Sequence, residues 1–157
     1  LGGGDMVDTV TFAKTTYAPV PLKFEAGTAN FSGAIALGEA GKFVQRFDPE
    51  EIERHEQALL RRATERLAAI AGLRIYGTAP GKCAIVSFNV EGVHPYDMGM
   101  ILDKLGIAVR TGQHCAEPVM DHYATTGMCR ASFALYNTQA EADALADGVE
   151  RAVRMLR

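Results

Sequence analysis

Residues 110–118 (Arg-Thr-Gly-Gln-His-Cys-Ala-Glu-Pro) combine residue types that could do chemistry. Cys115 stands there in a polar, glycine-containing stretch, with Arg110 and His114 close to it in sequence. A nucleophilic cysteine needs solvent access and a neighbour that favours the thiolate, and positive charge supplies the second. Arg130 follows 15 residues after Cys115, and a planar guanidinium can bind a carboxylate through two parallel hydrogen bonds. A thiolate together with a carboxylate-binding arginine predicts chemistry on an amino acid.

Each of these residues also has a purely structural interpretation. A free cysteine is often a small buried hydrophobe, arginines often serve as ion-pair partners, and His114 could be a loop histidine bonded to the backbone. Cys83 and Cys129 stand in apolar stretches, and both are expected in the core. A zinc site from His114, Cys115, His122 and Cys129 is a further alternative, although these residues lack the paired short spacing of structural zinc motifs.

Hydrophobic periodicity predicts the elements that must position these side chains. Asp48-Pro49 and the pair Thr138 and Glu141 are helix-start signals. The predicted helices are 31–47, 49–71, 95–105 and 139–156. The predicted strands are 73–76, 83–90, 107–110 and 129–135, and residues 111–127 are predicted to form a loop with a short helical turn. This order predicts an α+β layer, in which helices cover one face of a mostly antiparallel sheet of about four strands.

The first 47 residues have a different character. Residues 7–12 alternate as a strand does, and residues 22–28 are predicted to be extended and to end in a turn. The helix predicted over 31–47 has little charge, which predicts burial on more than one side.

The composition excludes some functions. The formal net charge is −3, with 16 basic and 19 acidic side chains, which argues against nucleic acid or an anionic membrane as the main partner. No apolar run approaches the roughly 18 residues that span a bilayer. Three cysteines are too few for a disulfide scaffold, so a reducing cytoplasmic location is predicted.

Four segments resemble one known family in order and spacing. RTGQHCAEP (110–118) and GMCRASFALYNT (127–138) resemble the active-site loop and following strand of the SufS-type (group II) cysteine desulfurases and selenocysteine lyases. GGGDMV (2–7) and KFEAGTANFSGAIALG (23–38) are similar to two further family segments, so the resemblance covers essentially the whole chain. It implies a fold-type-I pyridoxal-phosphate (PLP) enzyme acting as a homodimer. Residues 48–157 would be its small C-terminal domain, and residues 1–47 the end of its large domain with the connecting helix.

The resemblance also implies roles for single residues. Cys115 matches the cysteine that attacks the substrate sulfur and becomes a persulfide. Arg130 matches the arginine that holds the substrate carboxylate, and Arg110 an active-site arginine ahead of the cysteine loop. His114 matches the histidine just before the nucleophile, although Gln113 stands where some relatives have another histidine.

Two more residues match a cofactor segment. Gly27 and Thr28 match the stretch that reaches the PLP phosphate of the partner subunit, and a backbone N–H and a hydroxyl are suitable phosphate donors. The family holds PLP on a lysine in a Ser-x-His-Lys setting. None of the five lysines here follows a histidine, so that lysine is expected before Leu1. This chain by itself is therefore expected to bind no PLP covalently and to be inactive.

The implied function is transfer of sulfur from L-cysteine to Cys115, giving L-alanine. The persulfide would then pass to a sulfur-acceptor protein for iron–sulfur cluster assembly. A selenocysteine lyase acting on L-selenocysteine is one alternative, and a catalytically inactive dimerising domain is another.

Overall fold

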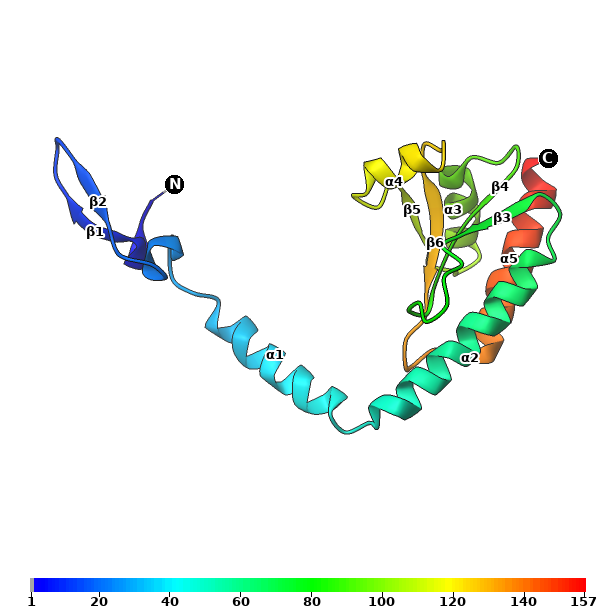
Figure 1. Cartoon of the computed structure of the whole chain (residues 1–157), viewed down its shortest axis with the longest axis horizontal. Coiled ribbons are helices and arrows are strands. Elements are labelled where there is room, and N and C mark those ends of the chain that lie inside the picture. Colours follow the sequence, from blue (N-terminus) through cyan, green and yellow to red (C-terminus); the bar gives the residue numbers. More distant parts are fainter. Residues whose placement is uncertain (1) are drawn as a thin grey trace. The chain divides into compact units, whose positions relative to one another are not determined.

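The computed structural model describes residues 2–157, and the chain divides into two compact units, Leu1–Phe47 and Asp48–Arg157 (Figure 1). Each unit has its own secondary structure. In the first unit the elements are the 3₁₀ turns Gly4–Met6 and Leu22–Phe24, the strands β1 (Val7–Val10) and β2 (Thr15–Tyr17), and the helix α1 (Phe31–Val44).

The first unit begins with an antiparallel hairpin of β1 and β2. The extended conformation predicted for 22–28 is wrong at its start, because Leu22–Phe24 forms a 3₁₀ turn. The carbonyls of Pro19 and Pro21 close this turn by accepting the N–H groups of Lys23 and Phe24, both at 3.1 Å.

Helix α1 begins at Asn30, whose side-chain oxygen accepts the N–H of Gly33 at 2.9 Å. It has no buried residue; for example, Phe31, Ile35 and Leu37 are 64–73% exposed. The low charge of this helix predicted burial, but no other part of residues 2–157 buries its side chains.

The second unit is an α+β domain, as predicted. Its sheet has the strand order β3-β4-β6-β5, and every neighbouring pair is antiparallel. The strands are β3 (Leu73–Tyr76), β4 (Ile85–Val90), β5 (Arg110–Gly112) and β6 (Met128–Ser132). The helices are α2 (Pro49–Ala68), α3 (Pro95–Lys104), α4 (Glu117–His122) and α5 (Gln139–Leu156).

The predicted helix starts are confirmed. The Asp48 carboxylate accepts the N–H of Glu50 at 3.0 Å, with Pro49 as the first helical residue of α2. Thr138 and Glu141 form a reciprocal capping box at the start of α5. Hydrogen bonds donated by the backbone N–H and the hydroxyl of Thr138 lower the pKa of the Glu141 carboxyl below its ordinary value.

The core lies between one face of the sheet and the helices α2, α3 and α5. Alternate residues of β4, Val86, Phe88 and Val90, point into it, and Cys129 of β6 joins them. Helices α2 and α5 pack side by side against this face (Figure 1). The short helix α4 differs, because its Met120 joins a second small cluster with Tyr76 and Met128 of the opposite, outer face.

Two strand predictions need correction. The strand predicted over 107–110 forms later, at Arg110–Gly112, because Ile107 and Val109 pack against the core outside the ladder. Cys83 is exposed, and its predicted place in the core is wrong because β4 begins only at Ile85. No helix in residues 2–157 is long and apolar enough to cross a membrane.

Candidate active site

The loop between β5 and β6 carries the candidate nucleophile on the outer side of the sheet. Arg110 opens β5, Cys115 follows in the loop, and α4 starts two residues later. The Nη2 atom of Arg110 lies 3.7 Å from the exposed Cys115 sulfur, in a donor–acceptor arrangement. Two of the residues predicted from sequence are thus in direct contact.

The second arginine lies directly across the ladder. Arg110 pairs with Arg130 in the β5–β6 register, and Arg130 pairs with Ser87 in the β4–β6 register. Residues directly opposite each other share a face of the sheet. Cys129 points into the core, so both guanidiniums belong to the outer face.

Two like charges placed opposite each other are destabilising unless something neutralises them. Within residues 2–157, neither Arg110 nor Arg130 is in an ion pair with a carboxylate. The Nε atom of Arg130 is buried and has no hydrogen-bond partner among these residues. This arrangement suits a bound anion, and the guanidinium geometry suits a carboxylate.

His114 lies beside this pair. Its Nε2 atom is 3.1 Å from the carbonyl of Met128; a carbonyl only accepts, so Nε2 carries the proton and Nδ1 is the acceptor of the neutral ring. Nδ1 is buried with no partner in the described chain. Burial, followed by the charge of Arg130, lowers the pKa of His114 below its ordinary value. The neutral imidazole therefore presents a free acceptor atom.

The backbone around the candidate nucleophile is strained. His114 and Cys115 have φ of 58° and 59°, and Ala124 has 52°. This left-handed region costs a non-glycine residue on the order of 1 kcal/mol or more. Such strain persists only where the surroundings impose it, and it is often found at functional sites.

The three cysteines have different surroundings. Cys129 is buried, and burial raises the pKa of its thiol to about 12. Its sulfur donates to the carbonyl of Pro95 at 3.3 Å. Cys83 and Cys115 are exposed. Cys129 is therefore an inert core thiol, as predicted.

This difference predicts a labelling pattern. At about pH 8, iodoacetamide should modify Cys83 and Cys115 in the folded chain, because only the thiolate reacts and the Cys129 thiol stays protonated. Cys129 should react only after denaturation. Mass spectrometry of the three cysteine peptides measures this, and native labelling of Cys129 at the rate of Cys115 would contradict it.

Gly27 and Thr28 lie in the first unit and are exposed. Gly4 lies close to the backbone of Gly27: a Cβ built on Gly4 would lie 2.8 Å from the Gly27 Cα. Gly4 also has φ of +56°, so only glycine fits this close approach without strain. Among the described residues, nothing lies within 4 Å of a Cβ built on Gly27, so there is free space beside its Cα.

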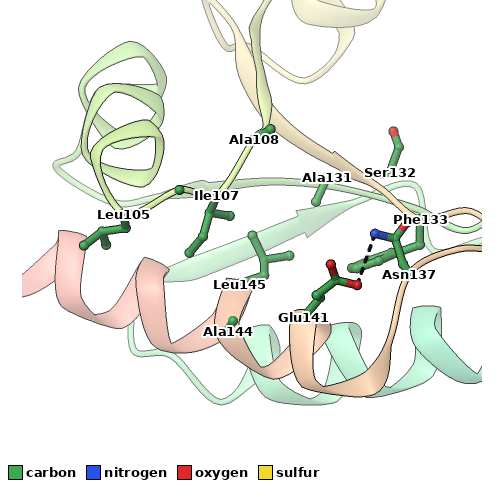
Figure 2. A pocket seen from close by; sticks show the side chains of 11 residues that line it. Leu105, Ile107, Ala108, Ala131, Ser132, Phe133, Asn137, Glu141, Ala144 and Leu145 are labelled. Carbon is green, nitrogen blue, oxygen red and sulfur yellow. Dashed lines mark hydrogen bonds between the residues drawn. The ribbon is translucent and has the colours of Figure 1, made fainter.

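A cavity of about 380 Å³ lies elsewhere in the second unit (Figure 2). Its lining comes from residues 105–108, β6 and α5, and Asn137 donates to Glu141 at its rim at 3.5 Å. None of the candidate site residues lines it. No group of three or more His, Cys, Asp or Glu side chains in residues 2–157 is arranged to hold a metal ion.

Comparison with known proteins places the chain in a class. The family model for class V aminotransferases matches residues 1–145, and the chain belongs to this family. Within it, the chain is similar to the C-terminal portion of cysteine desulfurases of the CsdA/SufS type (group II).

The similarity to cysteine desulfurases rests on individual relatives. The chain is 49% identical over 141 residues to a probable cysteine desulfurase of Xylella fastidiosa, covering 90% of this chain and 34% of the relative. It is 45% identical over 156 residues to a cysteine desulfurase of Escherichia coli, covering 99% and 38%. The chain thus spans little more than a third of the length of these curated relatives.

Two solved structures share the fold. The cysteine desulfurase CsdA of Escherichia coli matches with a TM-score of 0.85 and 39% identity, covering 100% of this chain and 39% of that one. The apo cysteine desulfurase of Thermococcus onnurineus NA1 matches with a TM-score of 0.82 and 38% identity, covering 99% and 39%.

Proposed function

We propose that this chain is the C-terminal part of a PLP-dependent cysteine desulfurase. It would supply Cys115 as the sulfur acceptor and Arg130 as the carboxylate ligand. The observation that carries the proposal is the facing pair of Arg110 and Arg130, with Cys115 in contact with the first of them. Similarity to cysteine desulfurases over nearly the whole chain supports the same reading.

The residues of the chain fit an amino-acid substrate. A substrate carboxylate at Arg130 would satisfy its buried Nε atom through charge-assisted hydrogen bonds. The exposed Cys115 sulfur could then approach the substrate sulfur from the loop. The neutral His114 offers Nδ1 as a hydrogen-bond acceptor beside the same arginines.

The proposed sulfur transfer is a nucleophilic displacement at the substrate sulfur. The Cys115 thiolate supplies an electron pair and forms a new S–S bond with the substrate sulfur. The substrate C–S bond breaks and leaves its electron pair on the substrate carbon. A proton added to that carbon gives alanine, and Cys115 is left as a persulfide.

The family is PLP-dependent, and bound PLP would act as the electron sink that makes the C–S bond breakable. The exposed Gly27 and Thr28 suit a phosphate group, because a backbone N–H and a hydroxyl are phosphate donors. We propose that they bind the PLP phosphate held by the partner subunit of a homodimer. The exposed apolar side chains of α1 suit a face that a second copy or another part of a longer polypeptide covers.

The two units have separate proposed origins. Residues 1–47 would be the end of a large cofactor domain with its connecting helix, and residues 48–157 the small C-terminal domain. The persulfide would pass to an acceptor protein in iron–sulfur cluster assembly in the cytoplasm. An exposed loop suits this role, because a sulfur on a surface loop can reach a partner.

The test uses a longer polypeptide that carries this chain and a PLP lysine. With L-cysteine we expect alanine release, and one extra sulfur atom on the Cys115 peptide by mass spectrometry. The 157-residue chain with added PLP is the control; it should form no stable aldimine that borohydride can reduce, and no alanine. Alanine formation without any sulfur on Cys115 would overturn the proposal.

A further inference from the structure

The loop from Gln113 to Thr126 is closed at its base by two glycines. Gly112 ends β5, and Gly127 immediately precedes β6. A Cβ built on Gly127 would meet the backbone of Gly112 at 3.2 Å. The backbone at the two ends of the loop is therefore closely packed, without room for a Cβ between Gly127 and Gly112.

The far part of the loop is held by packing. Met120 of α4 packs with Tyr76 and Met128 in the outer cluster, and the rings of Tyr76 and Tyr123 lie edge to face at 5.0 Å. This packing holds α4. The strained turn between α4 and β6, where Ala124 has φ of 52°, is tied to α4 by two backbone hydrogen bonds, which the N–H groups of Ala124 and Thr125 donate to the carbonyls of Asp121 and Met120 at 3.1 and 3.0 Å.

The side-chain hydrogen bonds that join this turn to the sheet come from Asn89 of the neighbouring strand β4. Its Nδ2 atom donates to the Gly127 carbonyl at 2.8 Å and to the Thr125 hydroxyl at 3.1 Å. The Thr125 hydroxyl in turn donates to the Gly127 carbonyl at 2.9 Å. The Asn89 side chain on β4 thus forms hydrogen bonds with Thr125 and Gly127, in the turn before β6. These residues are 36 and 38 positions away from Asn89 in sequence.

The oxygen of the Asn89 amide differs from its nitrogen in having no partner among the described residues. This Oδ1 atom is also buried. Turning the amide over would place an oxygen against the Gly127 carbonyl, which can only accept. A buried acceptor without a partner is unfavourable. The donor bonds to Gly127 and Thr125 therefore fix the orientation of the Asn89 amide.

We propose that Asn89 is a positioning residue for Cys115. It acts by clamping Thr125 and Gly127, which close the strained loop, so that the sulfur stays in a fixed place next to Arg110. The effect on turnover rests on the proposed desulfurase function, whereas the effect on the loop does not.

The variant that tests this is Asn89→Ala, compared with Gln57→Ala. Gln57 is a matched control because its Nε2 atom also donates to a loop carbonyl, that of Lys82, at 2.8 Å and part-buried. Hydrogen exchange of the amides of residues 113–126 is measured in the 157-residue chain. We expect faster exchange of these amides in Asn89→Ala, with β4 and α5 still protected, and wild-type exchange of the loop in Gln57→Ala.

A second measurement follows turnover of L-cysteine in the PLP-containing enzyme. Asn89→Ala should lower kcat by about 10- to 100-fold, as expected for a misplaced reacting group, with KM nearly unchanged because Arg130 is retained. Thr125→Val should give a smaller effect in the same direction, and none in addition when combined with Asn89→Ala.

These measurements test the clamp formed by Asn89 separately from the proposed desulfurase function. Wild-type loop exchange in Asn89→Ala would overturn the clamp whatever the activity. Faster loop exchange in an enzyme whose unsubstituted form makes no alanine from cysteine would keep the clamp and overturn the proposed function. Equal loss of kcat in Asn89→Ala and Gln57→Ala would mean that Asn89 acts only on general stability.

Discussion

The substitution Cys115→Ser should abolish sulfur release from L-cysteine, with a loss of at least about 1000-fold in kcat. A serine hydroxyl is a poor nucleophile toward sulfur and stays protonated, whereas the exposed Cys115 thiol can form a thiolate that accepts sulfur. Sulfide and alanine released by the PLP-containing enzyme are the measured quantities.

Cys83→Ser is the matched control, because Cys83 is also an exposed free cysteine and should be dispensable. Persistent cysteine turnover in Cys115→Ser would exclude Cys115 as the sulfur acceptor. Selenium leaves carbon more easily than sulfur, so selenocysteine turnover that survives Cys115→Ser is compatible with either enzyme. The rates of the unsubstituted enzyme with L-cysteine and L-selenocysteine distinguish the two, because a rate confined mainly to L-selenocysteine would favour the selenocysteine lyase alternative.

The substitution Arg130→Lys should raise KM for L-cysteine by about 10- to 100-fold. Arg130 presents a planar guanidinium whose buried Nε atom has no partner in the described chain. A lysine keeps the charge but cannot make paired hydrogen bonds to a carboxylate. Losing a charge-assisted bond of roughly 1.5–3 kcal/mol corresponds to this change in affinity.

Arg74→Lys provides the control for Arg130→Lys. Arg74 lies on β3, with its guanidinium 4.9 Å from the centre of the Tyr76 ring. A lysine there retains a cation above the ring, so KM should not change. A KM for Arg130→Lys equal to that of the unsubstituted enzyme would show that the carboxylate binds elsewhere.

Much of the second unit could be predicted from its sequence. The spacing of Leu59, Ala63 and Leu67 predicts the buried side of α2, and all three are buried. Thr138 and Glu141 predict the start of α5, and their capping box forms. These features depend on residues within a few positions of each other, so local periodicity and local hydrogen bonding are sufficient to determine them.

Some features could not be read in this way. Cys83 stands next to an apolar run, yet it is exposed because the ladder begins later, at Ile85. The sequence pattern does not single out Asn89 as a residue that positions the loop of Cys115. The only signal was an amide within an otherwise apolar strand, and its partners, Thr125 and Gly127, are far away in sequence.

The sequence by itself determined the residue types of the candidate site, the order of the main helices and strands of the second unit, and the buried side of α2. The tertiary structure decided that Arg110 faces Arg130, that the Arg110 guanidinium touches Cys115, and that the His114 Nδ1 atom has no partner among residues 2–157. The physical reason is that strand register and loop path result from pairing and packing between distant segments. A local pattern of apolar residues does not specify either of them.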